Sequence, residues 1–305
     1  MELYAAGCNA WQQLVRSSGV EADHVADVQT FQCILRGQTI QPPVSTIMST
    51  LVRHDRQYTR LGYETARPVP EHEAEFHSVA SASGSRLYGP IEHSTVRQTS
   101  KLRLERTGVP DVEIALDKPV VQMAAYDTGF AVLYTDGTVA TMGDPRFPEC
   151  LGREVSDKQP SNALATVDDL EGLDDPVTHI SAASYTLAAL TKSGCIYAWG
   201  RSSSGTHRQP QALSNLEGMP NYAAVAYDTD IADVAIGDGH AIALTTEGTV
   251  YVIGSNSNGQ LGLGDASVSR VDDWTKLDFQ APTGNVISRV AAGPRTSFII
   301  TAKQI

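Results

Sequence analysis

The sequence is poor in positive charge and in long apolar runs. It has 23 Lys and Arg against 35 Asp and Glu, a net charge of −12, and this balance disfavours binding to the phosphate backbone of nucleic acids. No run of about 18 apolar residues is present that could span a bilayer, and too few apolar residues follow Met1 for a secretion signal. We therefore expect a protein of the cytoplasm, or of cytoplasm and nucleus, that contacts neither a membrane nor nucleic acid.

Cysteine and catalytic motifs are also scarce. The four cysteines form no C-x-x-C pair, so we expect free thiols in a reducing compartment. H-E-x-x-H and G-x-S-x-G are absent, and the glycines of GQLGLGD (259–265) lack the Lys-Ser/Thr pair of a phosphate loop. In EHEAEFH (71–77) the spacing fits a solvated acidic loop better than a metal site. We predict a chain that is not an enzyme and that holds no cofactor or metal ion.

What the sequence does contain is an internal repeat. Four windows of 18 residues align without a gap, and they begin at Val120, Val177, Ile231 and Ile287, which are 57, 54 and 56 residues apart. In every window the first residue is β-branched, the fourth is apolar and the fourteenth is Leu or Ile. Such matching indicates that one structural unit has been copied.

Each copy is typical of a small antiparallel meander. The first three windows continue into a strand-like stretch that ends at Gly143, Gly200 or Gly254, and D-G, S-G and E-G turn signals separate the apolar runs. Helical periodicity is weak. One meander of three or four strands per 55 residues or so, repeated around an axis, predicts an all-β chain folded as a β-propeller.

The fourth window has no continuation after Gln304, but the other end of the chain supplies one. MELYAAG matches GTVYVIG, and GCNAWQQL matches GSNSNGQL, which aligns Asn9 with Asn256 and Gln13 with Gln260. We therefore expect residues 1–305 to form a single propeller domain whose ring is closed by a blade shared between the two termini, with nothing missing before Met1.

The N-terminal third carries the pattern less clearly. Residues 49–62 (STLVRHDRQYTRLG) resemble a strand pair with Arg56 at the glycine position of the turn, and residues 77–89 (HSVASASGSRLYG) resemble another. Six blade-like units can be counted in this way. A degenerate seventh could lie between Gly19 and Pro43 or between Pro90 and Pro119, so the prediction is six to seven blades, with seven favoured.

One stretch of sequence indicates a family. VAIGDGHAIALTTEGTVYVIGSNSNGQLGLGD (234–265) closely resembles the repeat of the regulator of chromosome condensation family, which implies a seven-bladed propeller closed by a shared blade. The acidic chain without a basic tail is similar to the small fungal accessory propellers of the killer-toxin-insensitivity type. That resemblance implies a heterodimer with a small CSL-type zinc-finger protein, Elongator as a further partner, and roles in tRNA wobble-uridine modification and diphthamide synthesis.

The aligned windows differ most at their seventh to tenth positions, where a hairpin tip is expected. Tips escape the packing that keeps strands alike, so binding specificity can reside there, although neutral drift in exposed turns would look the same. The predicted partner-binding residues are Tyr126, Asp127, Tyr185, Asp238, His240 and Arg295. Trp274 is added as an exposed anchor, with packing against its own blade as the alternative, whereas Trp199 fits the core.

Two other classes of function compete with a non-catalytic, protein-binding propeller. A guanine-nucleotide exchange factor would accelerate nucleotide release from a small GTPase, but no wedge-like insertion stands out. A propeller lyase would use His240 as a base near Asp238. The first class predicts stoichiometric complexes without turnover, which separates it from both alternatives.

Overall fold

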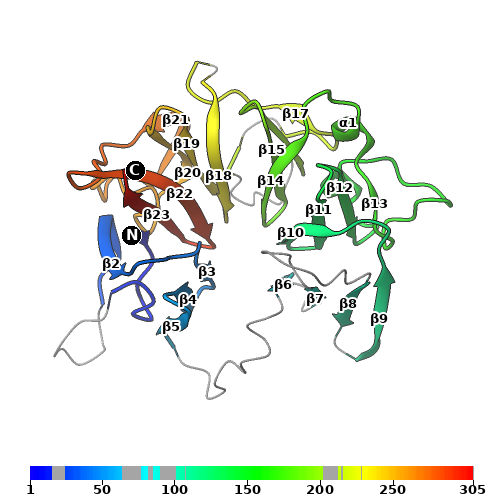
Figure 1. The fold of residues 1–305 in the computed structure, drawn as a ribbon, viewed down its shortest axis with the longest axis horizontal. Coiled ribbons are helices and arrows are strands. Elements are labelled where there is room, and N and C mark those ends of the chain that lie inside the picture. Colours follow the sequence, from blue (N-terminus) through cyan, green and yellow to red (C-terminus); the bar gives the residue numbers. More distant parts are fainter. Residues whose placement is uncertain are drawn as a thin grey trace. The chain divides into compact units, whose positions relative to one another are not determined.

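The computed structural model describes residues 1–15, 25–63, 77–81, 85–89, 101–106, 108–201, 212–213, 216–227 and 229–304 (Figure 1). The chain divides into two compact units. Unit 1 comprises Met1–Arg67, Ser203–Ser214 and Ala224–Ile305, and unit 2 comprises Pro68–Ser202 and Asn215–Ala223. Within the described residues almost every element is a strand, and no helix there is long and apolar enough to cross a membrane.

Unit 1 contains three antiparallel sheets. Their strand orders are β2-β1-β23-β22, β18-β19-β20-β21 and β3-β4-β5. The strands are β1 (Glu2–Gly7), β2 (Val28–Arg36), β3 (Val44–Ser45), β4 (Ser49–His54), β5 (Gln57–Gly62), β18 (Ile231–Gly237), β19 (His240–Thr245), β20 (Val250–Ser255), β21 (Arg270–Lys276), β22 (Asn285–Gly293) and β23 (Thr296–Lys303).

Unit 2 also contains three sheets, with the orders β6-β7-β8-β9, β10-β11-β12-β13 and β14-β15-β16-β17. The strands are β6 (His77–Ala80), β7 (Arg86–Gly89), β8 (Lys101–Arg106), β9 (Val109–Ala115), β10 (Val120–Tyr126), β11 (Gly129–Tyr134), β12 (Val139–Gly143), β13 (Ala165–Thr166), β14 (Val177–Ala183), β15 (Thr186–Thr191), β16 (Ile196–Gly200) and β17 (Asn221–Tyr222). A 3-10 turn, η2 (Pro148–Cys150), and a short helix, α1 (Asp168–Glu171), connect them.

One strand pairing recurs in all six sheets: the first residue of one strand lies opposite a glycine that is the last residue of its neighbour or, in β20, the last but one. The six pairs are Ser49 with Gly62, His77 with Gly89, Gly129 with Gly143, Thr186 with Gly200, His240 with Gly254, and Thr296 with Gly7. This recurrence confirms the strand pairs predicted at 49–62 and 77–89.

The structure explains why glycine is repeated at this place. Gly254 has φ of +99° and Gly7 has φ of +122°, in the left-handed region that side chains disfavour. A Cβ atom at Gly254 would also collide with the backbone carbonyl of Gly239, and one at Gly7 would collide with that of Arg295. In the turn of the β4–β5 hairpin, Arg56 adopts φ of +64° where the copies have glycine, as its alignment predicted.

The predicted shared blade is present. Strand β1 pairs with β23 from Glu2 opposite Thr301 to Gly7 opposite Thr296, and its other edge pairs with β2. The N and C marks of Figure 1 accordingly lie at one sheet of unit 1. Leu3 and Phe298, both fully buried, belong to the core of this sheet.

The loops after β1 and β20 confirm the alignment between the start of the chain and the clearest repeat. The side-chain oxygen of Asn9 accepts the Leu14 N–H at 2.9 Å, and that of Asn256 accepts the Leu261 N–H at the same distance. Gln13 and Gln260 likewise accept backbone N–H groups within their own loops. All four polar side chains are buried. In each loop the Asn and the Gln thus hold backbone N–H groups of that loop, and we call this pair its polar frame.

The favoured count of seven blades is not supported. In the described residues there are six sheets, and both intervals considered for a seventh supply outer strands instead. Strand β2 joins the shared sheet, and strands β8 and β9 extend the sheet that begins with β6 and β7. The sequence pattern alone could not assign these strands because outer strands carry little of the repeat.

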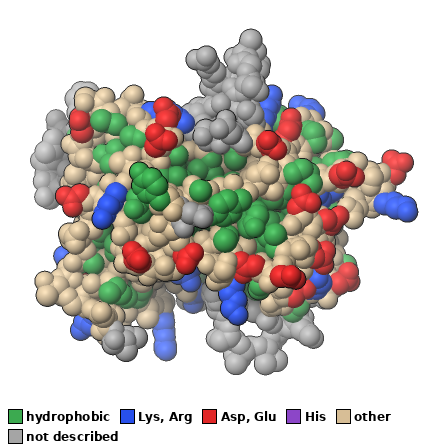
Figure 2. Space-filling model, turned by 90° about the horizontal axis from the view of Figure 1, so that it is seen from above, with side chains coloured by type: hydrophobic (Ala, Val, Ile, Leu, Met, Phe, Trp, Pro, Cys, Tyr) green, Lys and Arg blue, Asp and Glu red, His purple; other side chains and the backbone are tan. Residues whose placement is uncertain are grey.

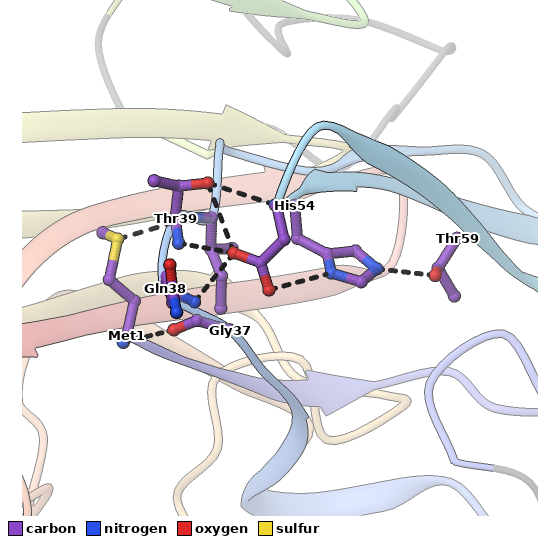
Figure 3. Close-up of polar contacts among 8 residues, drawn as sticks. Met1, Gly37, Gln38, Thr39, His54 and Thr59 are labelled. Carbon is purple, nitrogen blue, oxygen red and sulfur yellow. Dashed lines mark hydrogen bonds and ion pairs between the residues drawn. The ribbon is translucent and has the colours of Figure 1, made fainter.

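A polar network joins the shared sheet to the β4–β5 hairpin (Figure 3). One Asp55 carboxylate oxygen accepts the backbone N–H groups of Gln38 and Thr39, both at 2.8 Å. The bond from Thr39 is the main cause of the lowered pKa of Asp55. Next to it, the ammonium group of Met1 donates to the carbonyl of Gly37 at 2.7 Å.

Candidate functional site

The variable positions of the repeats do lie at hairpin tips. Each tip is a two-residue turn between paired strands: 127–128, 184–185, 238–239 and 294–295. Tips within one unit touch each other. In unit 2 the Asp127 N–H donates to the Ser184 carbonyl at 2.8 Å, and in unit 1 the Ser45 and Thr296 hydroxyls lie 3.1 Å apart.

Tyr126 is not an exposed tip residue. Its side chain is 2% exposed, and its hydroxyl donates to the Met142 carbonyl at 3.0 Å. The phenol lies over two glycines, Gly129 and Gly143, where any Cβ atom would approach its oxygen to 2.5 or 2.7 Å. Burial raises the pKa of this phenol. The tyrosine therefore supports the tip from within, and the expectation that it faces a partner is wrong in this respect.

His240 is buried in the same way. None of its surface is exposed, its ring lies against Gly237, and its Nε2 atom is 3.2 Å from the Thr296 carbonyl. Burial is the main reason that its pKa is lowered to about 4. A side chain sealed in this way cannot reach a partner or a substrate, which removes the geometric basis for His240 as a lyase base.

The other two predicted residues of unit 2 lie together in an aromatic and cationic cluster. Asp127 and Tyr185 are half-buried on adjoining tips. The pKa of Tyr185 is raised, first by burial and second by the charge of Asp127. Its ring lies 5.4 Å from that of Phe147 at an interplanar angle of 32°.

Two guanidinium groups flank Phe147. Those of Arg201 and Arg146 lie 5.3 and 5.8 Å from its ring centroid, within reach of cation–π attraction. Arg146 is also held by Asp144, with a closest nitrogen–oxygen distance of 2.6 Å. The tip surface of unit 2 therefore presents aromatic faces beside two guanidinium groups, of which that of Arg146 is paired with Asp144. The sequence alignment missed Phe147, Arg146 and Arg201 because they lie in the loops after the repeat windows.

The remaining predicted residues belong to unit 1. Asp238 is half-buried at its tip, Arg295 is exposed at the neighbouring tip, and Trp274 is half-buried on the outer strand β21. Asp238 and Arg295 thus have accessible surface on adjoining tips, whereas Trp274 belongs to no buried core cluster found among the described residues. On the face drawn in Figure 2, acidic side chains are spread among apolar and uncharged ones.

Unit 1 also has an exposed apolar surface that contains none of the predicted partner-binding residues. Four large apolar side chains lie beside its tips, and we call them the tip patch: Trp11, Ile47, Met48 and Tyr63. They are 47%, 52%, 41% and 53% exposed in that order. The Trp11 and Tyr63 rings meet edge to face with centroids 5.8 Å apart.

Backbone and side-chain bonds hold the tip patch together. The Gln13 amide donates to the Ile47 carbonyl at 3.0 Å, and the Tyr63 N–H donates to the Met48 carbonyl at 2.9 Å. Three segments of chain, from the loop after β1, the β3–β4 turn and the end of β5, are thereby fixed beside each other. The sequence held one signal of this patch, since Trp11 aligns with the polar Asn258 of the clearest repeat.

Among the residues that the structure describes, no group of three or more His, Cys, Asp or Glu side chains could hold a metal ion. Most of the segment EHEAEFH (71–77) lies outside these residues. The four cysteines are free thiols, as expected. Residues 259–265 form turns with positive φ at Gly259, Gly262 and Gly264, in agreement with their interpretation as a turn.

Comparison with known proteins gives the repeat type. The family model described as "Regulator of chromosome condensation (RCC1) repeat" matches residues 231–260, and a second model of the same description matches residues 247–300. The E3 ubiquitin-protein ligase HERC2 of Homo sapiens is 30% identical over 246 residues, which is 75% of this chain. The chain spans only 5% of the length of that relative.

Solved structures show the same fold. Human WBSCR16 matches with a TM-score of 0.58 at 13% identity, over 99% of this chain and 100% of that one. Yeast RCC1 (Prp20), solved bound to Kap60, also has a TM-score of 0.58, at 12% identity over 100% of this chain and 89% of that one. A further structure of Prp20p from Saccharomyces cerevisiae is described with its binding properties to Gsp1p and histones.

Proposed function

Because this chain is an RCC1-type repeat propeller, we propose that it is a non-catalytic module that binds a protein partner through the tip patch. The observation that carries the proposal is the exposure of Trp11 and Tyr63 in edge-to-face contact. Trp and Tyr are enriched among the residues that contribute most to protein–protein binding, and a contiguous exposed apolar patch marks an interaction site.

The neighbouring tips add polar contacts to this surface. The Cys8 N–H donates to the Arg295 carbonyl at 2.9 Å, which places the exposed Arg295 on the tip beside the loop that carries Trp11. An apolar centre with charged residues at its margin is the usual composition of a protein interface. Asp238 and Arg295 thus remain proposed contact residues, as do Asp127 and Tyr185 in unit 2 and Trp274.

For the partner we propose a small CSL-type zinc-finger protein, bound as a heterodimer. The support is the resemblance of this acidic propeller to the fungal accessory type, and the consequence would be a regulatory role in Elongator-dependent tRNA modification and in diphthamide synthesis. The cytoplasm, or the cytoplasm and nucleus, is the compartment that such a role requires.

Nucleotide exchange on a small GTPase is the alternative, and one observation favours it. The fold is that of yeast RCC1 (Prp20), whose structural description reports binding to Gsp1p. An exchange factor would also use a broad protein surface, so the tip patch alone does not distinguish the two functions.

The test is to purify the tagged full chain from its native cells and to identify by mass spectrometry what co-elutes in near-equal amount. A parallel chain carries Trp11→Ser and Tyr63→Ser. The matched control is Val286→Ser, because Val286 is 41% exposed on β22 of the same unit, at the strand end opposite the tips. We expect one small partner that is retained by the control and lost from the double variant.

The identity of the partner then separates the functions. A zinc-finger protein accompanied by Elongator subunits supports the adaptor, and a GTPase whose nucleotide release the purified chain accelerates supports the exchange factor. A partner that the double variant retains in full would refute the tip patch as the binding surface.

A further inference from the structure

Unit 2 contains a cleft of about 560 Å³ at its outer strands. One wall is formed by the consecutive residues 112–118, which include the second half of β9, and the other by residues 162–166, which include β13. Each wall is therefore a continuous stretch of backbone, and the cleft runs between the outer strands of two sheets. Its lining residues all belong to unit 2, whereas those of the tip patch belong to unit 1.

The floor of the cleft is apolar. Leu104, Ala140 and Met142 line it and are 5%, 2% and 5% exposed, and Tyr134 and Leu164 are half-buried beside them. Burial, followed by the charges of nearby aspartates, raises the pKa of Tyr134 to about 12, so its hydroxyl stays neutral. A ligand in this cleft would meet hydrocarbon at the floor, whereas the charged and polar side chains of Glu113, Asp117, Lys118 and Asn162 line its walls.

Both walls end in strands with an open edge. Among the residues that the structure describes, strands β9 and β13 are each the last in their sheet, so each has one row of backbone groups outside the ladder there. In unit 1 the edge of the outer strand β2 is covered. The Gly264 N–H donates to the Gln29 carbonyl at 2.9 Å, and Gly262 lies against the Phe31 ring. A loop of the neighbouring sheet covers that edge.

Arg106 is one of the charged residues that line the cleft; among the others, Glu113 is paired with Lys101 and Lys118 with Asp136. Along β8, Leu102 and Leu104 are buried while Lys101, Arg103 and Glu105 are exposed. Arg106 is half-buried at the end of the strand and lines the cleft together with Leu104. Its Nε atom is buried and has no hydrogen-bond partner among the described residues. A buried donor without a partner is unfavourable, and a carboxylate is the acceptor that suits a guanidinium best.

We propose that this cleft binds an extended peptide segment of a protein partner, which pairs with the free edge of β9 or β13 and places an acidic side chain on Arg106. Strand addition to an open edge gives affinity through the backbone, and the pockets beneath alternate residues give specificity. The seven residues of β9 extend about 23 Å at the usual rise per strand residue, which suits a segment of about seven or eight residues. The site goes beyond the proposed function and does not depend on it.

The probe is a pool of fluorescein-labelled, amidated octapeptides in which Val or Leu alternates with Thr and one Asp occupies each position in turn. Binding to the full chain is measured by fluorescence anisotropy, and a matched pool carries Asn in place of Asp. We expect saturable binding by at least one Asp register, weakened about tenfold or more by the Asn replacement. Amide hydrogen exchange should slow at residues 112–115 or 162–166 in the complex.

Variants of Arg106 make the test specific. Arg106→Gln should weaken the Asp peptide about tenfold, and Arg106→Glu should transfer the preference to a peptide with Lys at the same position. The control is Arg103→Gln, because Arg103 lies on the opposite, exposed face of the same strand. We expect the control to bind like the unaltered chain.

Three results would overturn the proposal. The first is the absence of saturable binding by any peptide of the pool, and the second is binding that Arg106→Gln leaves unchanged. The third is a concentration-dependent dimer that Arg106→Gln dissolves, which would identify a second copy of this chain as the occupant.

Discussion

At the scale of single residues, the buried imidazole of His240 can be tested through the pH dependence of the stability of the fold. It has no exposed surface and its pKa is lowered to about 4 from an ordinary value of 6.5. The unfolded chain therefore takes up a proton near pH 6.5, whereas the folded chain does so only near pH 4. Between these values protons favour the unfolded state, so this group stabilises the fold above pH 6.5 and loses that contribution as the pH falls.

We predict that His240→Gln removes part of the acid sensitivity of the fold. The pKa difference corresponds to about 2 to 3 kcal/mol of unfolding free energy lost by the unaltered chain between about pH 7.5 and pH 4.5. Urea unfolding at both pH values measures it, and the variant should lose less by that amount.

Tyr126→Phe is the matched control for this experiment. Tyr126 is a buried tip residue whose hydroxyl makes one hydrogen bond, and it does not titrate in this range. Its removal should cost about 1 kcal/mol at both pH values. An acid sensitivity that is equal in the His240 variant and the unaltered chain would contradict the assignment.

The individual side chains of the site were only partly predictable. Tyr126 and His240 are strand residues that flank the tips, and their burial depends on glycines across the hairpin, Gly129 and Gly237. A large residue paired with a glycine is a signal that the sequence contains. The contact between Trp11 and Tyr63 joins residues 52 positions apart, and no local pattern indicates it.

At the scale of elements, the loops after β1 and β20 show how a polar frame is repeated. Asn256 is 3% exposed, its oxygen accepts the Leu261 N–H and its amide donates to the Val268 carbonyl at 2.8 Å. The buried Leu261 is therefore held in place by a side chain of its own loop. Asn9 has the same role toward Leu14.

We predict that Asn256→Ala destabilises the chain by about 2 to 4 kcal/mol, because it leaves a buried N–H and a buried carbonyl without their partners. Asn9→Ala should have an effect of similar size. Thermal and urea unfolding measure both, with Ser257→Ala as the control, since Ser257 is exposed in the same loop. A loss in the asparagine variants no larger than that of the control would show that the frame contributes little.

Elements were predictable where the repeat is complete and not where it is reduced to outer strands. The strand pairs at 49–62 and 77–89 were found because each still has the glycine at its last position, Gly62 or Gly89, and a turn between its two strands. Strands β2, β8 and β9 have no equivalent marker. Six of the seven residues of β9 are exposed. Because neither face of this strand is buried, its sequence does not alternate between apolar and polar residues in a way that indicates which sheet it joins.

At the scale of the whole molecule, the pairing of β1 with β23 joins residues about 300 positions apart. Strand β1 buries Leu3, Ala5 and Ala6 and, within the described residues, is the only strand that pairs with β2. The stability of this sheet therefore depends on both ends of the chain.

Deletion of residues 1–7 should lower the unfolding free energy by more than about 3 kcal/mol, because a buried leucine, two buried alanines and the pairing of β2 are lost together. Differential scanning calorimetry measures it. The control lacks only residues 304 and 305, which follow β23, and should unfold close to the full chain. A deletion variant with an unchanged unfolding temperature would refute the role of the shared sheet.

The shared sheet also has a consequence for synthesis on the ribosome. Translation delivers β1 and β2 long before β23, so the edge of β1 that will meet β23 stays without its partner until residues 296–303 have been made. The other sheets are built from neighbouring segments and can form as they emerge. Strand β1 thus leaves the exit tunnel well before its second edge can be paired, and the shared sheet is completed only after synthesis has passed β23.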